Sequence, residues 1–465
     1  MTKLVKNREV DFTSGPMLKK IILYALPIIG VNILQLLFTM ADLAVLGIIT
    51  KNDNAIAAVG ASTPIINLFL GFLTGFSVGA NVKIAHLVGE KKVEKARAVV
   101  GTTVFISIVG GIILMIFGVM LAEQMLLWTN CAPSVLPYAT KYLRIYFLGM
   151  PIIVIYNFCT AILRAVGDTS RPLLFLILSG IVNVLLNVFF IVVVKLDIEG
   201  VAIATVASHL VSGICILVLM CKNPGYAKIE RNSIKFSKSI FYDLIKIGLP
   251  VAVSKILFSF ANVIVSSELN ILGDIAMTAH SITKEFDGFI LEVVHGISVA
   301  ALVVISQNYG AKNMDRIKKV AFLSSFMVTV LSLALGALLI VFGKTFCGIM
   351  TDTEAVLELC MVRIYTVSIF YMILGLLNVV QDVIRGMGYS LTATLISVLA
   401  NIVLRFIYIY FVYPFITIAG NLAHNLKMLY ILYPACWFSA LVVATVIAII
   451  LFINVKKRIE SEKEN

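Results

Sequence analysis

Residues 18–47 read LKKIILYALPIIGVNILQLLFTMADLAVLG, a nearly unbroken apolar stretch. A helix needs roughly 20 apolar residues to cross the hydrocarbon core of a bilayer, so this stretch is long enough to span a membrane. Uncapped apolar helices of this length are unusual in soluble proteins. The stretch also has no small-residue cleavage site at its end, so it predicts a retained first membrane span rather than a signal peptide.

Four polar side chains interrupt this stretch, namely Asn32, Gln35, Thr39 and Asp42. At about 100° per residue they fall within about 80° of one another and share one face of the helix. A carboxylate inside a membrane is costly, so it usually faces protein or water and marks a transport pathway. We therefore predict that Asp42 is functional and that Asn32 and Gln35 line a substrate cavity. The alternative is that Asp42 lies in the headgroup layer at the helix end.

The composition extends this prediction to the whole chain. The 465 residues are 60% hydrophobic and 13% charged, and the mean hydropathy is +1.03. These values are typical of a polytopic membrane protein. We predict an all-α protein with twelve transmembrane helices, near residues 18–47, 55–87, 98–121, 141–163, 172–194, 200–221, 244–272, 276–308, 320–342, 361–384, 391–413 and 428–454. The seven cysteines form no C-x-x-C pair, so we expect buried thiols and no metal site.

The distribution of Lys and Arg predicts the orientation. If the N-terminus is cytoplasmic, the inner connections and tails carry 25 of these residues and the outer connections carry 5. Positive charge concentrates on the cytoplasmic side of membrane proteins. Both termini are therefore expected in the cytoplasm, with the chain crossing the cell membrane many times. The net charge of +12 follows from this topology and predicts no nucleic-acid partner.

The two halves of the sequence resemble each other. Four motifs recur in the same order at offsets of 219 to 223 residues. They are Gly89-Glu90-Lys91-Lys92 with Gly310-Ala311-Lys312-Asn313, Arg144-Ile145-Tyr146 with Arg363-Ile364-Tyr365, Arg164-Ala165-Val166-Gly167 with Arg385-Gly386-Met387-Gly388, and Pro27 with Pro250. A repeat of six helices keeps its orientation in the membrane. We predict six-helix lobes at 1–221 and 244–465, joined by a cytoplasmic connection at 222–243 and related by a pseudo-two-fold axis along the membrane normal.

The eighth predicted span carries five ionisable residues: Lys284, Glu285, Asp287, Glu292 and His295. At about 100° per residue they fall within an arc of roughly 160°. Because so many charges are costly against lipid, we predict that the arc lines the substrate cavity. Its balance of one Lys against three carboxylates favours cationic substrates or protons. The alternative is local pairing of Lys284 with Asp287 three residues along the helix.

Other polar and small residues have a simpler interpretation. Asn183 and Asn187 are one helical turn apart, and such amides either form a site or link neighbouring helices. Asp382 and Arg385 have the spacing of a local ion pair. Gly71, Gly75 and Gly79 recur every four residues, which favours close helix packing. The sequence has no phosphate-binding loop and no catalytic signature, so we predict neither ATP-driven transport nor an enzyme.

Over residues 15–455 the chain resembles the multidrug and toxic compound extrusion (MATE) family. The resemblance rests on the Pro27 helix that ends in Asp42 and Gly47, on Val88-Gly89 and the basic loop after it, and on the following strings: Leu163-Arg164-Ala165-Val166-Gly167-Asp168-Thr169, Ser179-Gly180-Ile181-Val182-Asn183 with Asn187, Gly200-Val201-Ala202-Ile203-Ala204-Thr205, Gly248-Leu249-Pro250 and Asn308-Tyr309-Gly310-Ala311-Lys312. The Leu-Arg-Ala-x-Gly-Asp-Thr string is the most specific of these.

The resemblance implies a secondary transporter that exports cationic or amphipathic drugs or metabolites in exchange for H⁺ or Na⁺ by rocking of two lobes. It implies no cofactor, a lipid bilayer environment and, as we expect, a monomer. It assigns cation or proton coupling to Asp42, Asn183, Asn187 and Thr205. Asn187 departs from the pattern, because many members have Asp there, and the second half lacks the carboxylates of NorM-like members. The chain is therefore more similar to DinF-like and Gram-positive branches.

Two other functions remain as alternatives. A lipid-linked precursor flippase of the same superfamily would favour a more cationic cavity and additional spans. A membrane-embedded enzyme would need a nucleophile or metal set gathered at one membrane face.

Overall fold

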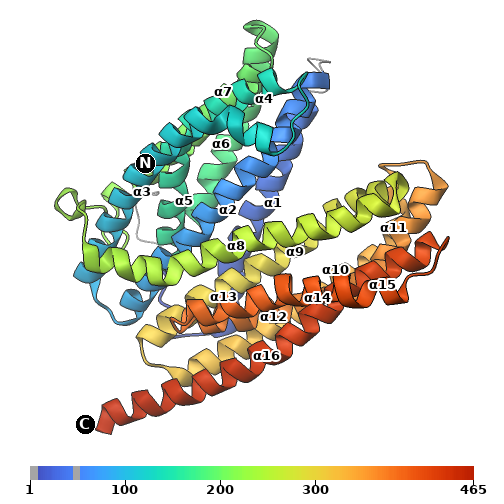
Figure 1. The fold of residues 1–465 in the computed structure, drawn as a ribbon. Helices are drawn as coiled ribbons and strands as arrows, with labels where there is room; N and C mark the ends of the chain where they lie inside the picture. Colours follow the sequence, from blue (N-terminus) through green and yellow to red (C-terminus); the bar gives the residue numbers. More distant parts are fainter. Residues whose placement is uncertain (1–8, 46–52, 465) are drawn as a thin grey trace. The chain divides into compact units, whose positions relative to one another are not determined.

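The computed structural model describes residues 9–45 and 53–464, and the side chains of residues 9–38 and 54–462. These parts of the chain form helices and no strands (Figure 1). The α-helices are α1 (Met17–Val45), α2 (Asp53–Gly89), α3 (Val93–Trp128), α4 (Leu136–Leu148), α5 (Met150–Ala165), α6 (Ser170–Val188), α7 (Ile198–Lys222), α8 (Lys238–Leu272), α9 (Asp274–Gly310), α10 (Met314–Gly348), α11 (Glu354–Val367), α12 (Tyr371–Gly386), α13 (Ser390–Val398), α14 (Leu404–Ile407), α15 (Tyr413–Ile416) and α16 (Leu422–Glu464). Between them lie the π-helices η2 (Phe189–Val193), η5 (Leu399–Val403) and η6 (Tyr408–Val412) and the short 3₁₀ turns η3 (Arg231–Ser233) and η4 (Ser368–Phe370).

The helices are long and apolar enough for the predicted membrane spans. Within the described chain, 11 helices qualify, and the bent pair α4–α5 makes 12 if it counts as one span. This pair bends by 53° next to Pro151, which lacks the backbone N–H that would continue the hydrogen-bond ladder. The all-α architecture and the predicted span positions are confirmed, with α4–α5 as the fourth span.

The contacts divide the chain into two compact units. Unit 1 comprises Met1–Asp11 and Gly30–Ala252, and unit 2 comprises Phe12–Ile29 and Val253–Asn465. The first part of α1 therefore packs within unit 2, and the first part of α8 packs within unit 1. In each helix the change comes three residues after a proline, Pro27 or Pro250. These divisions fall at different positions from the lobe boundaries predicted from the repeat.

The segment before α1 is held at both of its ends. In unit 1, the backbone N–H of Val10 donates to the carbonyl oxygen of Val166 at 2.9 Å. In unit 2, the backbone N–H of Phe12 donates to Gln307 Oε1 at 3.0 Å, and the Phe12 side chain is only 1% exposed. Arg316 Nη2 donates to the carbonyl oxygens of Phe12, Ser14 and Gly15 at 3.1 to 3.2 Å. This segment is thus an ordered part of both units.

The connection between the halves packs on unit 1. Arg97, in the second turn of α3, donates to the carbonyl oxygens of Pro224 and Gly225 at 2.9 and 3.2 Å. The same guanidinium forms an ion pair with Glu230 at 2.9 Å. The predicted connection is therefore anchored through one arginine.

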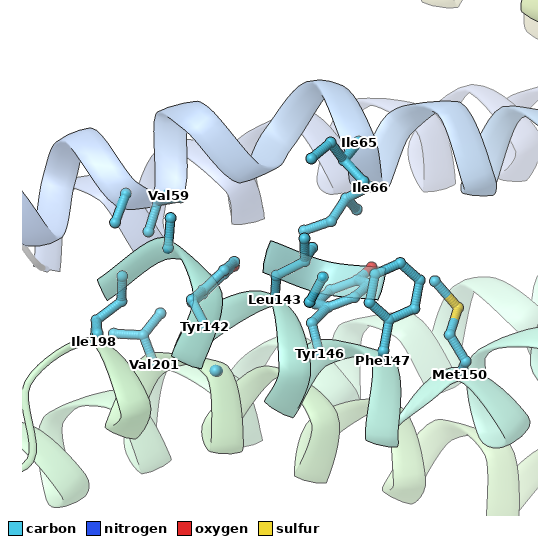
Figure 2. Close-up of a cluster of buried hydrophobic side chains, with 14 of the residues drawn as sticks. Val59, Ile65, Ile66, Tyr142, Leu143, Tyr146, Phe147, Met150, Ile198 and Val201 are labelled. Atoms are coloured by element: carbon cyan, nitrogen blue, oxygen red, sulfur yellow. The ribbon is translucent and has the colours of Figure 1, made fainter. Parts of the chain in front are cut away.

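An apolar core fills unit 1 between α2, α4 and α7. Figure 2 shows the α4 side chains Tyr142, Leu143 and Phe147 between Ile65 of α2 and Val201 of α7. Each of these side chains is at most 6% exposed. The short helix α4 is therefore fixed by apolar packing on two sides.

Two of the glycines in α2 permit close packing against the first part of α8. A Cβ atom on Gly75 would lie 2.5 Å from the Cα of Ala252, and a Cβ on Gly79 would overlap the carbonyl oxygen of Leu244. Side chains here would force the two backbones apart. The packing role predicted for Gly75 and Gly79 is confirmed.

We expect Gly79→Ala to destabilise the protein by about 1–3 kcal/mol, because overpacking against backbone cannot be relieved by a side-chain rotation. Thermal unfolding of the purified protein in detergent measures the effect. The matched control is Gly110→Ala in α3, where a Cβ would meet no atom within 4 Å and where alanine favours the helix. Equal stability of the two variants would contradict the packing role.

Candidate functional site

A polar cluster lies inside unit 1, between α6 and α7. We call Asn183, Asn187 and Thr205 the unit 1 polar cluster. Asn187 Nδ2 donates to Asn183 Oδ1 at 3.2 Å, and Asn183 Nδ2 donates to Thr205 Oγ1 at 3.4 Å. Asn183 is 5% exposed and Asn187 is fully buried. Three of the four residues assigned to cation coupling by the resemblance therefore lie in hydrogen-bond contact.

Neighbouring residues hold this cluster in place. Ser179, one turn before Asn183, donates to the carbonyl oxygen of Ser208 on α7 at 2.7 Å, which ties the two helices together. Gly180 leaves room for the ring of Phe38, which a Cβ atom would overlap. Because Phe38 belongs to α1, this contact brings α1 against the helix that carries both amides.

The polar face predicted for α1 is described only in part. Asn32 is buried at 8% exposure, whereas Gln35 is exposed. Both belong to the part of α1 that packs in unit 1. The side chains of Thr39 and Asp42 lie outside the described residues, so the coupling role of Asp42 stays a prediction.

Unit 2 contains a buried ion pair that the sequence analysis did not predict. Arg363 Nη2 of α11 lies 2.6 Å from Asp287 Oδ2 of α9, and the two side chains are 7% and 6% exposed. Arg363 Nη1 also donates to the carbonyl oxygen of His280 and to Thr283 Oγ1, both at 3.0 Å. Its guanidinium carbon lies 5.3 Å from the ring centroid of Tyr430 on α16. The pair therefore links α9 and α11 beside α16.

The equivalent place in unit 1 is apolar. Asp287 follows Ile66 by 221 residues, the offset that relates Gly89 to Gly310. Ile66 lies in the apolar core of Figure 2. Arg144, the repeat counterpart of Arg363, is exposed and lies 3.4 Å from Glu123. The same helix arrangement therefore packs without a buried ion pair in the other half.

The predicted arc of charges on α9 holds for four residues and not for Asp287. Lys284 and Glu285 are exposed, and Glu292 and His295 are half-buried, with His295 Nδ1 4.0 Å from Glu292 Oε2. Asp287 is buried at 4% exposure against Arg363. The expectation that Asp287 faces a cavity is corrected, and so is its alternative pairing with Lys284, because the partner comes from α11. The repeat motif contained Arg363, but the sequence could not show which helix it contacts.

A second buried acid in unit 2 forms the predicted local pair. Arg385 Nη1 lies 2.8 Å from Asp382 Oδ1, and Ser298 Oγ donates to Asp382 Oδ2 at 2.7 Å. In unit 1, Asp168 and Arg171 pair in the same way three residues apart. The prediction of a local Asp382–Arg385 ion pair is confirmed.

Many long apolar helices, with amides and ion pairs buried inside them, are typical of a polytopic membrane transporter. The model of the MatE family matches residues 27–189 and 250–411. The chain therefore belongs to the MatE family, whose members are transporters and not enzymes. The family model matches twice, once in each half, which confirms the internal repeat.

Named relatives and solved structures agree with this assignment. The chain is 26% identical to the probable multidrug resistance protein YoeA of Bacillus subtilis, over 81% of this chain and 83% of the relative. It is 24% identical to the probable multidrug resistance protein NorM of Thermotoga maritima, over 82% of each chain. A MOP superfamily transporter from Pyrococcus furiosus has the same fold, with a TM-score of 0.88 at 20% identity over 97% of this chain and 99% of the other.

Proposed function

We propose that this protein is a secondary active exporter of small amphipathic molecules, driven by H⁺ or Na⁺ and working by rocking of two lobes in the cell membrane with both termini in the cytoplasm. The observation that carries the proposal is the unit 1 polar cluster. Buried amides inside membrane helices supply oxygen ligands and hydrogen-bond acceptors at a depth where apolar side chains are the rule. Asn183 and Thr205 come from different helices, α6 and α7, so a cation bound there would bias the packing between them.

Asn187 contributes to the choice of ion. An amide oxygen can accept a hydrogen bond or ligate a cation, but it takes up no proton at physiological pH. In the proposed site the only proton acceptor among the four assigned residues is therefore Asp42.

Transport by the purified protein in proteoliposomes tests the proposed function. A pH gradient and a sodium gradient are imposed separately, and accumulation of a fluorescent cationic dye is recorded. Accumulation driven by one of the gradients, and lost when that gradient is collapsed, supports the proposal. Dye movement that is unaffected by both gradients contradicts it.

The acidic residues of α9 predict a preference for positively charged substrates. We expect the double variant Glu285→Gln with Glu292→Gln to reduce export of a cationic dye at least fivefold, while export of a neutral dye of similar size falls less than twofold. The reason is loss of attraction between two accessible carboxylates and the cation. The control double variant, Glu354→Gln with Glu358→Gln, removes two exposed carboxylates of α11. Equal losses for both dyes would contradict the prediction.

A further inference from the structure

Arg405 of α14 is a buried cation without a carboxylate partner. Its side chain is among the largest that are fully buried, with 1% exposure. Arg405 Nη1 donates to Asn262 Oδ1 of α8 at 3.0 Å, and Nη2 donates to Asn401 Oδ1 of η5 at 3.4 Å. Among the described side chains, the acids buried in unit 2 pair with Arg363 and Arg385, and none pairs with Arg405. One positive charge is therefore left unbalanced inside unit 2.

Two aromatic rings lie beside this guanidinium. Its central carbon is 5.7 Å from the ring centroid of Phe258 on α8 and 5.1 Å from that of Tyr433 on α16. Arg405 Nε has no hydrogen-bond partner among the described residues. The rings cover the faces of the guanidinium, and an N–H group at its edge remains available.

Such a charge is costly in an apolar interior unless it is paired. Amide oxygens and rings compensate it less well than a carboxylate or phosphate does, because ionised acceptors form hydrogen bonds roughly twice as strong. The fold does not require the charge, since the corresponding part of α6 in unit 1 carries Leu185 and no arginine between residues 172 and 194. A role in binding explains why a positive group is retained at this place.

The backbone around Arg405 is also unusual. The four-residue helix α14 lies between the π-helices η5 and η6. Each π-turn inserts an extra residue into a helix, and such insertions occur frequently at functional sites. Here they determine the side on which Asn401 and Arg405 lie, so the irregular backbone and the unbalanced charge coincide.

We propose that Arg405 is the group in unit 2 that binds an anionic part of the transported molecule, with Phe258 and Tyr433 packing against its apolar part. A guanidinium holds a carboxylate or phosphate through paired hydrogen bonds. The approach runs along α8, where Phe258 is 42% exposed and Lys255, one turn earlier, is also exposed. The inference rests on the proposed export function and names its substrate class: amphipathic molecules that carry a carboxylate or phosphate, including zwitterions.

Fluorescence of Trp437 provides a binding assay that does not depend on transport. The chain has two tryptophans, so Trp128→Phe leaves Trp437 as the only one. Its ring lies 5.7 Å from that of Tyr433, next to Arg405. The protein is reconstituted in nanodiscs of phosphatidylcholine and titrated with benzoate, with the uncharged analogue benzamide, and with a short-chain phosphatidylglycerol. Saturable change with benzoate identifies soluble anions as ligands, and change with the lipid alone identifies a lipid phosphate.

The decisive variant is Asn262→Asp, which keeps the shape of the site and gives Arg405 a carboxylate partner. We expect it to weaken anion binding at least tenfold, as Arg405→Gln also should. The control Asn270→Asp makes the same substitution at an exposed position two turns further along α8 and should change binding less than twofold.

Two results would overturn the inference. One is unchanged anion binding by Asn262→Asp, and the other is the absence of saturable change with either anion in the parent protein. Failure of the export function is seen separately, because it would abolish gradient-driven dye accumulation while anion binding at Arg405 persists.

Discussion

Asp287→Leu is expected to lower the stability of the protein by about 3–5 kcal/mol, the usual effect of removing one partner from a buried ion pair. The loss arises because Arg363 stays buried at 6% exposure without its counter-charge. Thermal unfolding in detergent should show a clearly lower midpoint. Glu354→Leu, which removes one partner of the exposed pair with Lys344, should have a much smaller effect, because surface ion pairs contribute little.

The double variant Asp287→Leu with Arg363→Met separates the pair from the cost of an unpaired charge. Buried ion pairs can often be replaced by apolar residues without loss of stability, and unit 1 packs apolar residues around Ile66 at the equivalent place. We expect the double variant to be more stable than Asp287→Leu alone. If both are equally destabilised, the defect is one of shape and not of charge.

Asp42→Asn is expected to reduce gradient-driven export to the background level while the protein remains folded and inserted. The carboxylate would be the only group able to take up a proton among the four residues proposed for coupling, and it would supply the negative charge for a bound Na⁺. Counterflow in proteoliposomes and size-exclusion chromatography measure function and folding separately. Asp352→Asn, at an exposed position before α11, is the control and should export normally. Export against a gradient at the normal rate by Asp42→Asn would exclude the coupling role.

Apolar length and local spacing were sufficient to predict much of this structure. The predicted span at residues 320–342 lies within α10 (Met314–Gly348), which continues beyond the apolar stretch because its backbone bonds also form at the polar ends. Asn183 and Asn187 were predicted to share a face from their spacing of four, and they are hydrogen-bonded. Such features depend only on residues that are close in the sequence.

Partners that are distant in the sequence could not be predicted. Helical periodicity placed Asp287 on a charged arc, but it could not show that Arg363, 76 residues later, covers that position. The irregular backbone at residues 399–412 breaks the helical period, so the inward position of Arg405 could not be derived from it. The membership of residues 12–29 in unit 2 likewise depends on contacts across nearly the whole chain.

This membership has a consequence for biogenesis. Residues 12–29 leave the ribosome first, yet Gln307 and Arg316, which bind the beginning of this segment, are translated almost 300 residues later. Unit 1 similarly depends on residues 238–252, from the second half of the gene. Domains usually fold in the order of their synthesis, but here neither can finish before part of the other has been made. Nascent chains arrested before residue 316 should therefore leave the N-terminal segment accessible to protease, and longer ones should protect it.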